Sequence, residues 1–410
     1  LIFLKRNEHA LQTSPSQFAF KEGKGTTLCA LAVKEVIMHY INQGSNIFSC
    51  FLDATKAFDR IRFDYLFRNL VERNVKWCDL RLLLDLYTRQ KVRTTWKQSN
   101  SDYFKTTNGI RQGGIASPVL FCTYLDGIIE ALRKEAAGCW IGHQFLGIFV
   151  YADDIVLLSP SANGLKRMLN VCHTYAYNRG IKFNPSKSVC MKFGDVKGRA
   201  KYPVLEVNGA AMTWVEEFRY LGVHLTRDLS ERAEVGRKRA DLFGRTNSLM
   251  GNFASMPRTV RQRVFLAKCA HLYGCQAWNL SDRNVFRMKT AYNRCLRRVL
   301  GLPNRTHSVY LPLLAQTISF ECNLYRKIRR FYERMKISKC HMIQFLSKVC
   351  MNDSFSIMRA NSFVFENFVE PEPSDENVAT VLGVIELLDQ PPEGFSVSEA
   401  VNLANFLCCF

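Results

Sequence analysis

The sequence lacks several features that would place a protein in a membrane or around a structural metal. No stretch approaches the roughly 18 apolar residues that a helix needs to cross a bilayer, which excludes membrane insertion. None of the 15 cysteines forms a CxxC pair, so neither a zinc ribbon nor a redox motif can be drawn. Most cysteines are isolated in the sequence, which favours reduced, buried thiols in an intracellular protein.

A leader segment is also lacking at the start of the sequence. The first residue is Leu1 rather than methionine, and no charged segment leads into an apolar one, so no secretory signal is visible. We therefore expect a fragment of a longer protein. At 410 residues the fragment is long enough for two or three domains.

Basic residues are absent from the last 51 residues, which carry nine acidic ones. The rest of the chain is basic, since 56 Lys and Arg stand against 36 Asp and Glu overall. Between Arg227 and Lys339, 24 basic residues outnumber 7 acidic ones. A protein with such an excess of basic residues usually binds a polyanion, and this favours nucleic acid over an anionic membrane surface as its partner. Prolines among acids at 371–394 predict a loose tail.

Sequence patterns typical of strands and of helices alternate to about residue 225, and beyond it only helical patterns follow. This predicts an α/β or α+β core followed by a helical region. Ser117 and Pro118 are predicted as the N-cap and first residue of a helix. The predicted helices are 24–43, 63–89, 117 onwards, 162–179, 231–250, 258–275 and 283–300. The predicted strands are 47–52, 92–96, 103–107, 145–151, 154–158, 181–183, 189–193 and 218–225.

Two adjacent acids, Asp153 and Asp154, interrupt an apolar segment and are predicted at the tip of a hairpin. Asp53 follows a buried strand in the same way. Buried carboxylates are costly unless a cation neutralises them, and Mg²⁺ takes oxygen ligands from a few carboxylates, water and phosphate. The three acids therefore predict a two-ion site. Taken alone, Asp53 is better explained as a turn or cap residue.

Five segments resemble, in order and spacing, motifs A to E of reverse transcriptases. The similarity is nearest to polymerases of non-LTR, LINE-type retrotransposons of the jockey type. It covers about residues 14 to 225, and more weakly the helical region to about residue 315. The segments are Phe51–Asp59 (motif A), Gly109–Pro118 (B), Tyr151–Asp154 (C), Gly180–Lys187 (D) and Phe218–Gly222 (E).

The resemblance implies an α+β right-hand polymerase that acts as an RNA-directed DNA polymerase. Its partners would be an RNA template, a DNA primer and deoxynucleoside triphosphates. Its cofactor would be two Mg²⁺ ions, with Mn²⁺ as an alternative. It also implies a retroelement ribonucleoprotein in the nucleus and cytoplasm. The expected domains are partial fingers (1–46), a palm with an inserted fingers segment (47–225), a helical basic thumb or extension (226–340) and an acidic tail (341–410).

The resemblance assigns the chemistry to a few residues. Asp53, Asp153 and Asp154 would hold the metal ions, and the Leu52 carbonyl would help to hold the triphosphate. Lys187 would protonate the pyrophosphate leaving group. A lysine in an Asn-Pro-Ser-Lys turn is as often merely solvated, and that alternative stays open.

The resemblance also implies residues around the nucleotide. Phe58 would lie beneath the sugar and exclude a 2′-hydroxyl, unless it is only a core residue of the following helix. Gln112 and Gly113 would lie beside the incoming nucleotide, and they also suit an ordinary turn.

Residues 17–24 resemble the family's Q-x-G-F-R-x-G-R segment, but Ala19 stands where glycine is usual, and Lys21 and Lys24 replace the arginines. The resemblance implies that Lys21 or Lys24 meets template or triphosphate. Because of these departures, solvated lysines are the simpler interpretation.

Cations on the helical region are expected to track phosphates without reading sequence. They are Arg297, Arg298, Arg329 and Arg330. Two alternatives to a DNA polymerase remain. One is a nucleic-acid-binding remnant without catalysis. The other is an RNA-templated RNA polymerase, which would not be expected to carry an aromatic gate. Because the family's earlier finger motifs would precede Leu1, we expect this chain to hold primer-template but to use nucleotides poorly.

Overall fold

The computed structural model describes residues 1–194 and 202–369, and the chain forms two compact units. The described part of unit 1 consists of residues 1–194, 202–221, 227–229 and 338–346. The described part of unit 2 consists of residues 222–226, 230–337 and 347–369. The tail predicted at 371–394 lies outside the described residues. In the described ranges, no helix is long and apolar enough to cross a membrane.

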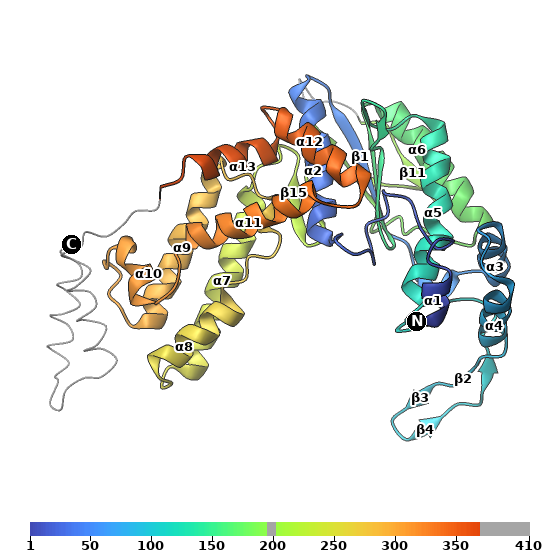
Figure 1. Ribbon diagram of the computed structural model, residues 1–410, viewed down its shortest axis with the longest axis horizontal. Helices are drawn as coiled ribbons and strands as arrows, with labels where there is room; N and C mark the ends of the chain where they lie inside the picture. The colour runs from blue at the N-terminus through green and yellow to red at the C-terminus, as the bar shows by residue number, and fades with distance from the viewer. Residues whose placement is uncertain (195–201, 370–410) are drawn as a thin grey trace. The chain divides into compact units, whose positions relative to one another are not determined.

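Unit 1 is built on a five-stranded sheet of order β13-β10-β1-β9-β8. Its central strand β1 is labelled in Figure 1. Neighbouring strands are antiparallel except for β10 and β13, which are parallel. Together with its helices, this sheet confirms the α+β class. The strands are β1 (Ile47–Leu52), β8 (Ile148–Tyr151), β9 (Asp154–Ser159), β10 (Val189–Phe193) and β13 (Thr213–Trp214).

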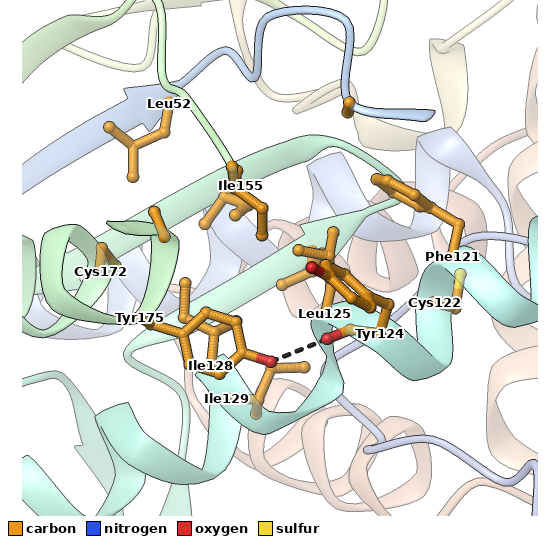
Figure 2. Packing of buried hydrophobic residues seen from close by; sticks show 14 of the residues in the cluster. Leu52, Phe121, Cys122, Tyr124, Leu125, Ile128, Ile129, Ile155, Cys172 and Tyr175 are labelled. Atoms are coloured by element: carbon orange, nitrogen blue, oxygen red, sulfur yellow. Dashed lines mark hydrogen bonds between the residues drawn. The ribbon is translucent and has the colours of Figure 1, made fainter. Parts of the chain in front are cut away.

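The core of unit 1 forms because alternate residues of each strand face opposite sides of the sheet. On one side, Leu52 and Ile155 pack with helices α5 (Ser117–Glu135) and α6 (Ala162–Asn178) (Figure 2). Within this layer the Tyr175 hydroxyl donates to the Tyr124 carbonyl (2.8 Å) and joins the two helices. Burial on this scale, about 25 cal/mol per Å² of apolar surface, is the main source of stability.

The other side of the sheet is covered as well. Phe51 lies between Cys50 and Leu52 in β1, so its side chain faces the opposite side of the sheet. Its ring packs on those of Phe218 and Tyr220, with centroids 4.8 Å and 5.4 Å away. The Tyr220 hydroxyl contacts the Cys29 thiol of helix α2 (Thr26–Asn42) at 3.2 Å. Coverage of both faces explains why the strands are nearly continuous apolar runs in the sequence.

The remaining elements of unit 1 are the buried helix α2, which packs on β1 and β8, and a set of shorter elements. The predicted helix 63–89 is two helices, because Asn74 (φ +57°) breaks it. Residues 181–183 form a single bridge instead of a strand. The elements are α1 (Ile2–Arg6), α2 (Thr26–Asn42), a 3₁₀ turn (Phe58–Arg60), α3 (Phe63–Glu72), α4 (Trp77–Thr88), β2 (Lys91–Val92), β3 (Thr95–Trp96), β4 (Ser99–Asn100), β5 (Phe104–Lys105), β6 (Trp140–Ile141), β7 (Gln144–Phe145), β11 (Glu206–Val207), β12 (Ala210–Ala211) and β14 (Glu217–Tyr220).

Unit 2 is helical, with α7 (Arg232–Phe253) packed on α9 (Arg283–Leu300). The apolar face predicted for 283–300 is buried, and this helix ends at Gly301 (φ +71°) as predicted. The predicted helix 258–275 ends early in a π-helical turn at Phe265–Cys269. The elements are β15 (Val223–Thr226), α7 (Arg232–Phe253), α8 (Arg258–Val264), a 3₁₀ turn (Cys275–Ala277), α9 (Arg283–Leu300), a 3₁₀ turn (Ser308–Tyr310), α10 (Leu311–Leu314), α11 (Phe320–Lys336) and α13 (Ile357–Glu366), with α12 (His341–Asn352) divided between the units.

Candidate active site

Asp53 lies at the end of the central strand β1, and its backbone is hydrogen-bonded to a loop that is distant in the sequence. Its N–H donates to the Ser188 hydroxyl (3.1 Å), and its carbonyl accepts from the Asn184 N–H (2.7 Å). The Thr55 N–H donates to the Lys182 carbonyl (2.8 Å). The loop 182–188 therefore fixes the start of the segment 53–59. Sequence reasoning did not identify Ser188, because its partner lies 135 positions away.

The adjacent acids lie at the tip of the β8–β9 hairpin, as predicted. Tyr151 pairs with Asp154, which leaves Ala152 and Asp153 as the turn. Strand β9 also pairs with β1, and Leu52 of β1 lies opposite Ile155 of β9. Because the two strands are antiparallel, Asp53, which follows Leu52, and Asp154, which precedes Ile155, come to the same end of the pair. The sheet therefore brings the three predicted carboxylates to one end of two neighbouring strands.

Electrostatics show that these carboxylates affect one another. Partial burial, and then the charges of Asp153 and Asp53, raise the pKa of Asp154 to about 6. Burial, followed by the charge of Asp53, also raises the pKa of Asp153. Within the described ranges none of the three forms a salt bridge. The site thus collects negative charge without a protein cation to offset it.

The donor set fits a hard divalent cation that is shared with a substrate. Among the described residues, no group of three or more His, Cys, Asp or Glu side chains could hold a metal ion by itself. Mg²⁺ is usually bound by one or two carboxylates, with waters and substrate phosphates completing its shell. Three mutually repelling carboxylates at one sheet end suit that mode, whereas a closed protein cage is absent from the described chain.

A second loop fixes the other end of the segment 53–59. The Phe58 carbonyl accepts from the Ile110 N–H (2.9 Å), and the Ile61 carbonyl from the Gly109 N–H (2.7 Å). Gly109 has φ +84°, and a Cβ there would lie 3.0 Å from the Asp59 carbonyl oxygen. Only glycine therefore permits this close approach of the two backbones.

Phe58 is half-buried, and its ring stacks on Phe121 of α5 with centroids 4.3 Å apart and planes within 9°. It packs against the core of unit 1 while keeping part of its surface accessible. Phe58 therefore packs on the core, but it belongs to the 3₁₀ turn Phe58–Arg60 and not, as the alternative expected, to the following helix. The role beneath a sugar stays a prediction.

The loop before α5 carries Gln112 and Gly113, which are both exposed. Gln112 donates to the Asp59 carboxylate (3.3 Å), and Gly113 has φ +84°. The predicted N-cap Ser117 was wrong by one position. Ala116 is the N-cap, no side chain caps the helix, and Ser117 is buried against Gly114.

The two predicted lysines of the N-terminal segment turn inward. The Lys21 ammonium donates to the carbonyls of Thr13 (2.8 Å) and Ser14 (2.7 Å), and burial lowers its pKa to about 8. The Lys24 ammonium donates to the carbonyls of Pro15 (2.5 Å) and Gln17 (3.4 Å). The interpretation of both as fully solvated was therefore wrong. Contact with template or triphosphate stays a prediction.

The remaining predicted residues have different surroundings. Leu52 is buried, and Lys187 is exposed in the loop that binds Asp53. In unit 2, half-buried Arg297 donates to the Thr306 carbonyl and the Ser308 hydroxyl (2.8 Å each), and Arg298 donates to Asn247. Exposed Arg329 pairs with Glu333 (3.4 Å).

Arg330 belongs to a cluster of cations around a cavity of about 730 Å³ in unit 2. Lys327 and Arg334, on the same helix, line it as well. Tyr273, an exposed aromatic side chain, lies at the same cavity. We call this set the basic groove. Its cations and aromatic ring are the residue types that bind the phosphates and bases of single strands.

Comparison with known proteins identifies a family. The family model described as "Reverse transcriptase (RNA-dependent DNA polymerase)" matches residues 3–225. This range contains the acidic hairpin, the end of β1 and both loops that fix the segment 53–59. It ends where the predominantly helical unit 2 begins.

Several curated proteins are similar to this chain. The RNA-directed DNA polymerase from mobile element jockey of Drosophila funebris is 22% identical over 302 residues, 70% of this chain and 32% of that protein. A Pol polyprotein from a type-1 retrotransposable element of Nasonia vitripennis is 26% identical over 44% of this chain and 17% of its own length. The chain spans less than half of these relatives. An apo telomerase structure from Candida tropicalis has a TM-score of 0.43 and 10% identity, over 98% of this chain and 60% of that one.

Proposed function

The chain belongs to the reverse transcriptase (RNA-dependent DNA polymerase) family, and on that premise we propose that it is the RNA-directed DNA polymerase of a non-LTR retrotransposon. It would add deoxynucleotides to a primer 3′-hydroxyl on an RNA template, by nucleotidyl transfer with two bound Mg²⁺ ions. The observation that carries this proposal is the set of three uncompensated carboxylates at one end of β1 and the β8–β9 hairpin.

The proposed chemistry divides between bound metal and protein. Divalent ions, when bound, supply charge neutralisation of the phosphates and a lowered pKa of the primer hydroxyl. Asp53, Asp153 and Asp154 would hold these ions. The two loops that fix the segment 53–59 would keep Asp53 and Phe58 in a constant relation, and positioning of this kind provides much of the rate in phosphoryl transfer.

Other residues have proposed roles around the nucleotide. Phe58 would exclude the 2′-hydroxyl, Gln112 and Gly113 would lie beside the incoming nucleotide, and the Leu52 carbonyl would contact the triphosphate. Exposed Lys187 would supply a proton to the pyrophosphate. Lys21 and Lys24 would support the triphosphate or template only if they leave their carbonyl partners on binding.

The basic groove of unit 2 supports a role for this unit in holding nucleic acid. Its cations are exposed and share one face of α11, so they can follow a phosphate backbone without reading sequence. Arg329 is already paired with Glu333, and therefore Lys327 and Arg330 are the stronger candidates. Arg297 and Arg298 remain proposed contacts, although each already has a partner in unit 2.

Replacing Lys327 and Arg330 together by alanine is expected to weaken primer-template binding equally for unrelated sequences. Each lost phosphate contact reduces the magnitude of the slope of log affinity against log salt by about 0.9. The slope of the double variant should therefore be smaller in magnitude than that of the parent by up to about 1.8. Fluorescence anisotropy over a salt series measures the slope. Arg167→Ala is the control, because it removes an exposed cation paired with Glu135 in unit 1. Equal slopes for parent and double variant would place the groove outside the binding surface.

The alternative function is nucleic-acid binding without catalysis, which the net charge and the basic groove would also explain. A pure binder gains nothing from clustered carboxylates that repel phosphate, and this favours the enzyme. Primer extension with Mg²⁺ distinguishes the two, since only the enzyme lengthens the primer.

A retroelement ribonucleoprotein would act in both nucleus and cytoplasm, which cell fractionation of the tagged chain tests.

A further inference from the structure

A fully buried amide side chain, Gln17, holds the backbone beside the acidic hairpin. Its Oε1 accepts hydrogen bonds from the N–H groups of Ala152 (3.2 Å) and Ala19 (3.0 Å), and none of the residue is exposed. Ala152 directly precedes Asp153 and has φ +57°, in the left-handed region. A non-glycine residue keeps that conformation only where its surroundings fix it. Gln17 provides such a constraint one residue before the acids.

The backbone around Gln17 is bound to the same hairpin. The Ser16 carbonyl accepts from the Val150 N–H (2.9 Å), and the Phe18 N–H donates to the Val150 carbonyl (2.8 Å). Residues 16–18 therefore run along β8, which is the last strand in the sheet order. This segment brings Gln17 to the turn with its backbone already in register.

The loop that carries Gln17 is itself fixed. Lys21 and Lys24 donate to carbonyls at four of the five positions from Thr13 to Gln17. The Ser14 N–H donates to the Asp126 carboxylate of α5 (2.6 Å), which also pairs with Arg73 (2.6 Å). The hairpin tip is thus connected through Gln17 to a clamped loop and a core helix.

The chemistry of the side chain suits this place. Both of its partners are N–H donors, so the carbonyl end of the amide must face them. The Nε2 group is buried without a hydrogen-bond partner in the described structure. Glutamate would accept the same two bonds and leave no donor unpaired, but it would add a fourth negative charge near three carboxylates. An amide is the acceptor that avoids this charge.

We propose that Gln17 is a positioning residue, which sets the Ala152–Asp153 turn so that Asp153 and Asp154 can hold a divalent metal. The proposal rests on the proposed function of the three carboxylates. It concerns the geometry of the metal site, and it can be tested by the binding of Mn²⁺ in the absence of nucleotide and nucleic acid, where water molecules take the coordination positions that substrate phosphates would occupy.

The test compares Gln17→Met and Gln17→Glu in the full chain. Methionine has nearly the same size but cannot accept the two bonds, whereas glutamate retains the acceptor. Asn7→Ala is the matched control, because Asn7 is also a buried amide that accepts from a backbone N–H, that of Lys76 (3.0 Å), at a site built with Asp79. Mn²⁺ affinity from the EPR signal of free Mn²⁺, melting temperature, and kcat and KM of primer extension are measured.

We expect Gln17→Met to weaken Mn²⁺ binding at least about fivefold and to lower kcat about 30-fold, with KM for primer-template unchanged. This size is reasonable, because displacing a reacting group by about 1 Å can cost about 100-fold in rate. Gln17→Glu should bind Mn²⁺ at least as tightly as the parent. Asn7→Ala should lower the melting temperature without changing Mn²⁺ affinity.

Mn²⁺ affinity of Gln17→Met within twofold of the parent, or an equal loss in Asn7→Ala, would overturn the proposal. Absence of Mn²⁺ binding by the parent would overturn it as well. If Gln17→Met does not fold, Gln17→Asn takes its place, because a shorter amide moves the acceptor away from Ala152. A parent that binds Mn²⁺ but extends no primer would refute the proposed function, and the Mn²⁺ affinities would still decide the role of Gln17.

Discussion

Asp153→Asn is expected to reduce Mg²⁺-dependent primer extension by at least about 1,000-fold, which corresponds to about 4 kcal/mol of activation free energy. The amide has nearly the same shape but lacks the charge that would hold the metal. Burial and the charge of Asp53 raise the pKa of the Asp153 carboxyl, so the folded, metal-free chain holds this ionised group at a cost. The variant should therefore melt no lower than the parent. Single-turnover extension and thermal melting measure the two effects.

Asp85→Asn is the matched control for this variant, since Asp85 is an exposed carboxylate on α4 that pairs with Arg89 (2.5 Å). A surface pair of this kind is worth roughly 0 to 1 kcal/mol, so extension should be unchanged. Primer-template affinity should be unchanged in both variants. Extension by Asp153→Asn at the rate of the parent would remove the carboxylates from the mechanism.

Phe58→Val is expected to raise the use of ribonucleotides relative to deoxynucleotides by about 100-fold or more, or about 2.7 kcal/mol of discrimination. The stack on Phe121 holds the ring rigidly, so a 2′-hydroxyl would meet a side chain that cannot move away. Valine leaves space for that hydroxyl. The ratio of kcat/KM for the two sugars on one template measures the change, and Phe58→Tyr should retain the selectivity of the parent.

Phe63→Val separates lost packing from lost selectivity. Phe63 is another half-buried ring of the same core, in edge contact with Phe67 and Tyr87. Both valine variants should lower the melting temperature, but only Phe58→Val should change the sugar ratio. The same ratio in both variants would show that the gate lies elsewhere and that Phe58 serves packing alone.

Sequence patterns predicted the elements whose signals are local. The helix Arg283–Leu300 has a periodic apolar face and a glycine stop, and both are as expected. The single strand predicted at 218–225 was wrong, because Leu221 (φ +47°) and Gly222 (φ +82°) separate two strands. An apolar run does not reveal such a turn, since hydrophobicity carries no information on the sign of φ.

Some residues of the candidate site could likewise be predicted from the sequence, and others could not. Asp153 and Asp154 were evident because charged residues inside an apolar run are costly to bury. Ser188 and Gln17 were not identified as site residues, because each acts on a backbone N–H far away in the sequence, at Asp53 and at Ala152. Gln17 stands first in a segment, residues 17–24, that resembles a finger motif of the family, but the resemblance does not reveal its partner, because only the folded sheet brings Gln17 to Ala152.

The most direct measurement is extension of a labelled DNA primer on an RNA template by the purified chain, with deoxynucleotides and Mg²⁺. The account predicts products that reach the template end, that require Mg²⁺ or Mn²⁺, and that disappear in Asp153→Asn. Tight binding of primer-template without any extension, under conditions in which divalent metal binds, would contradict the account and favour a binding protein without catalysis.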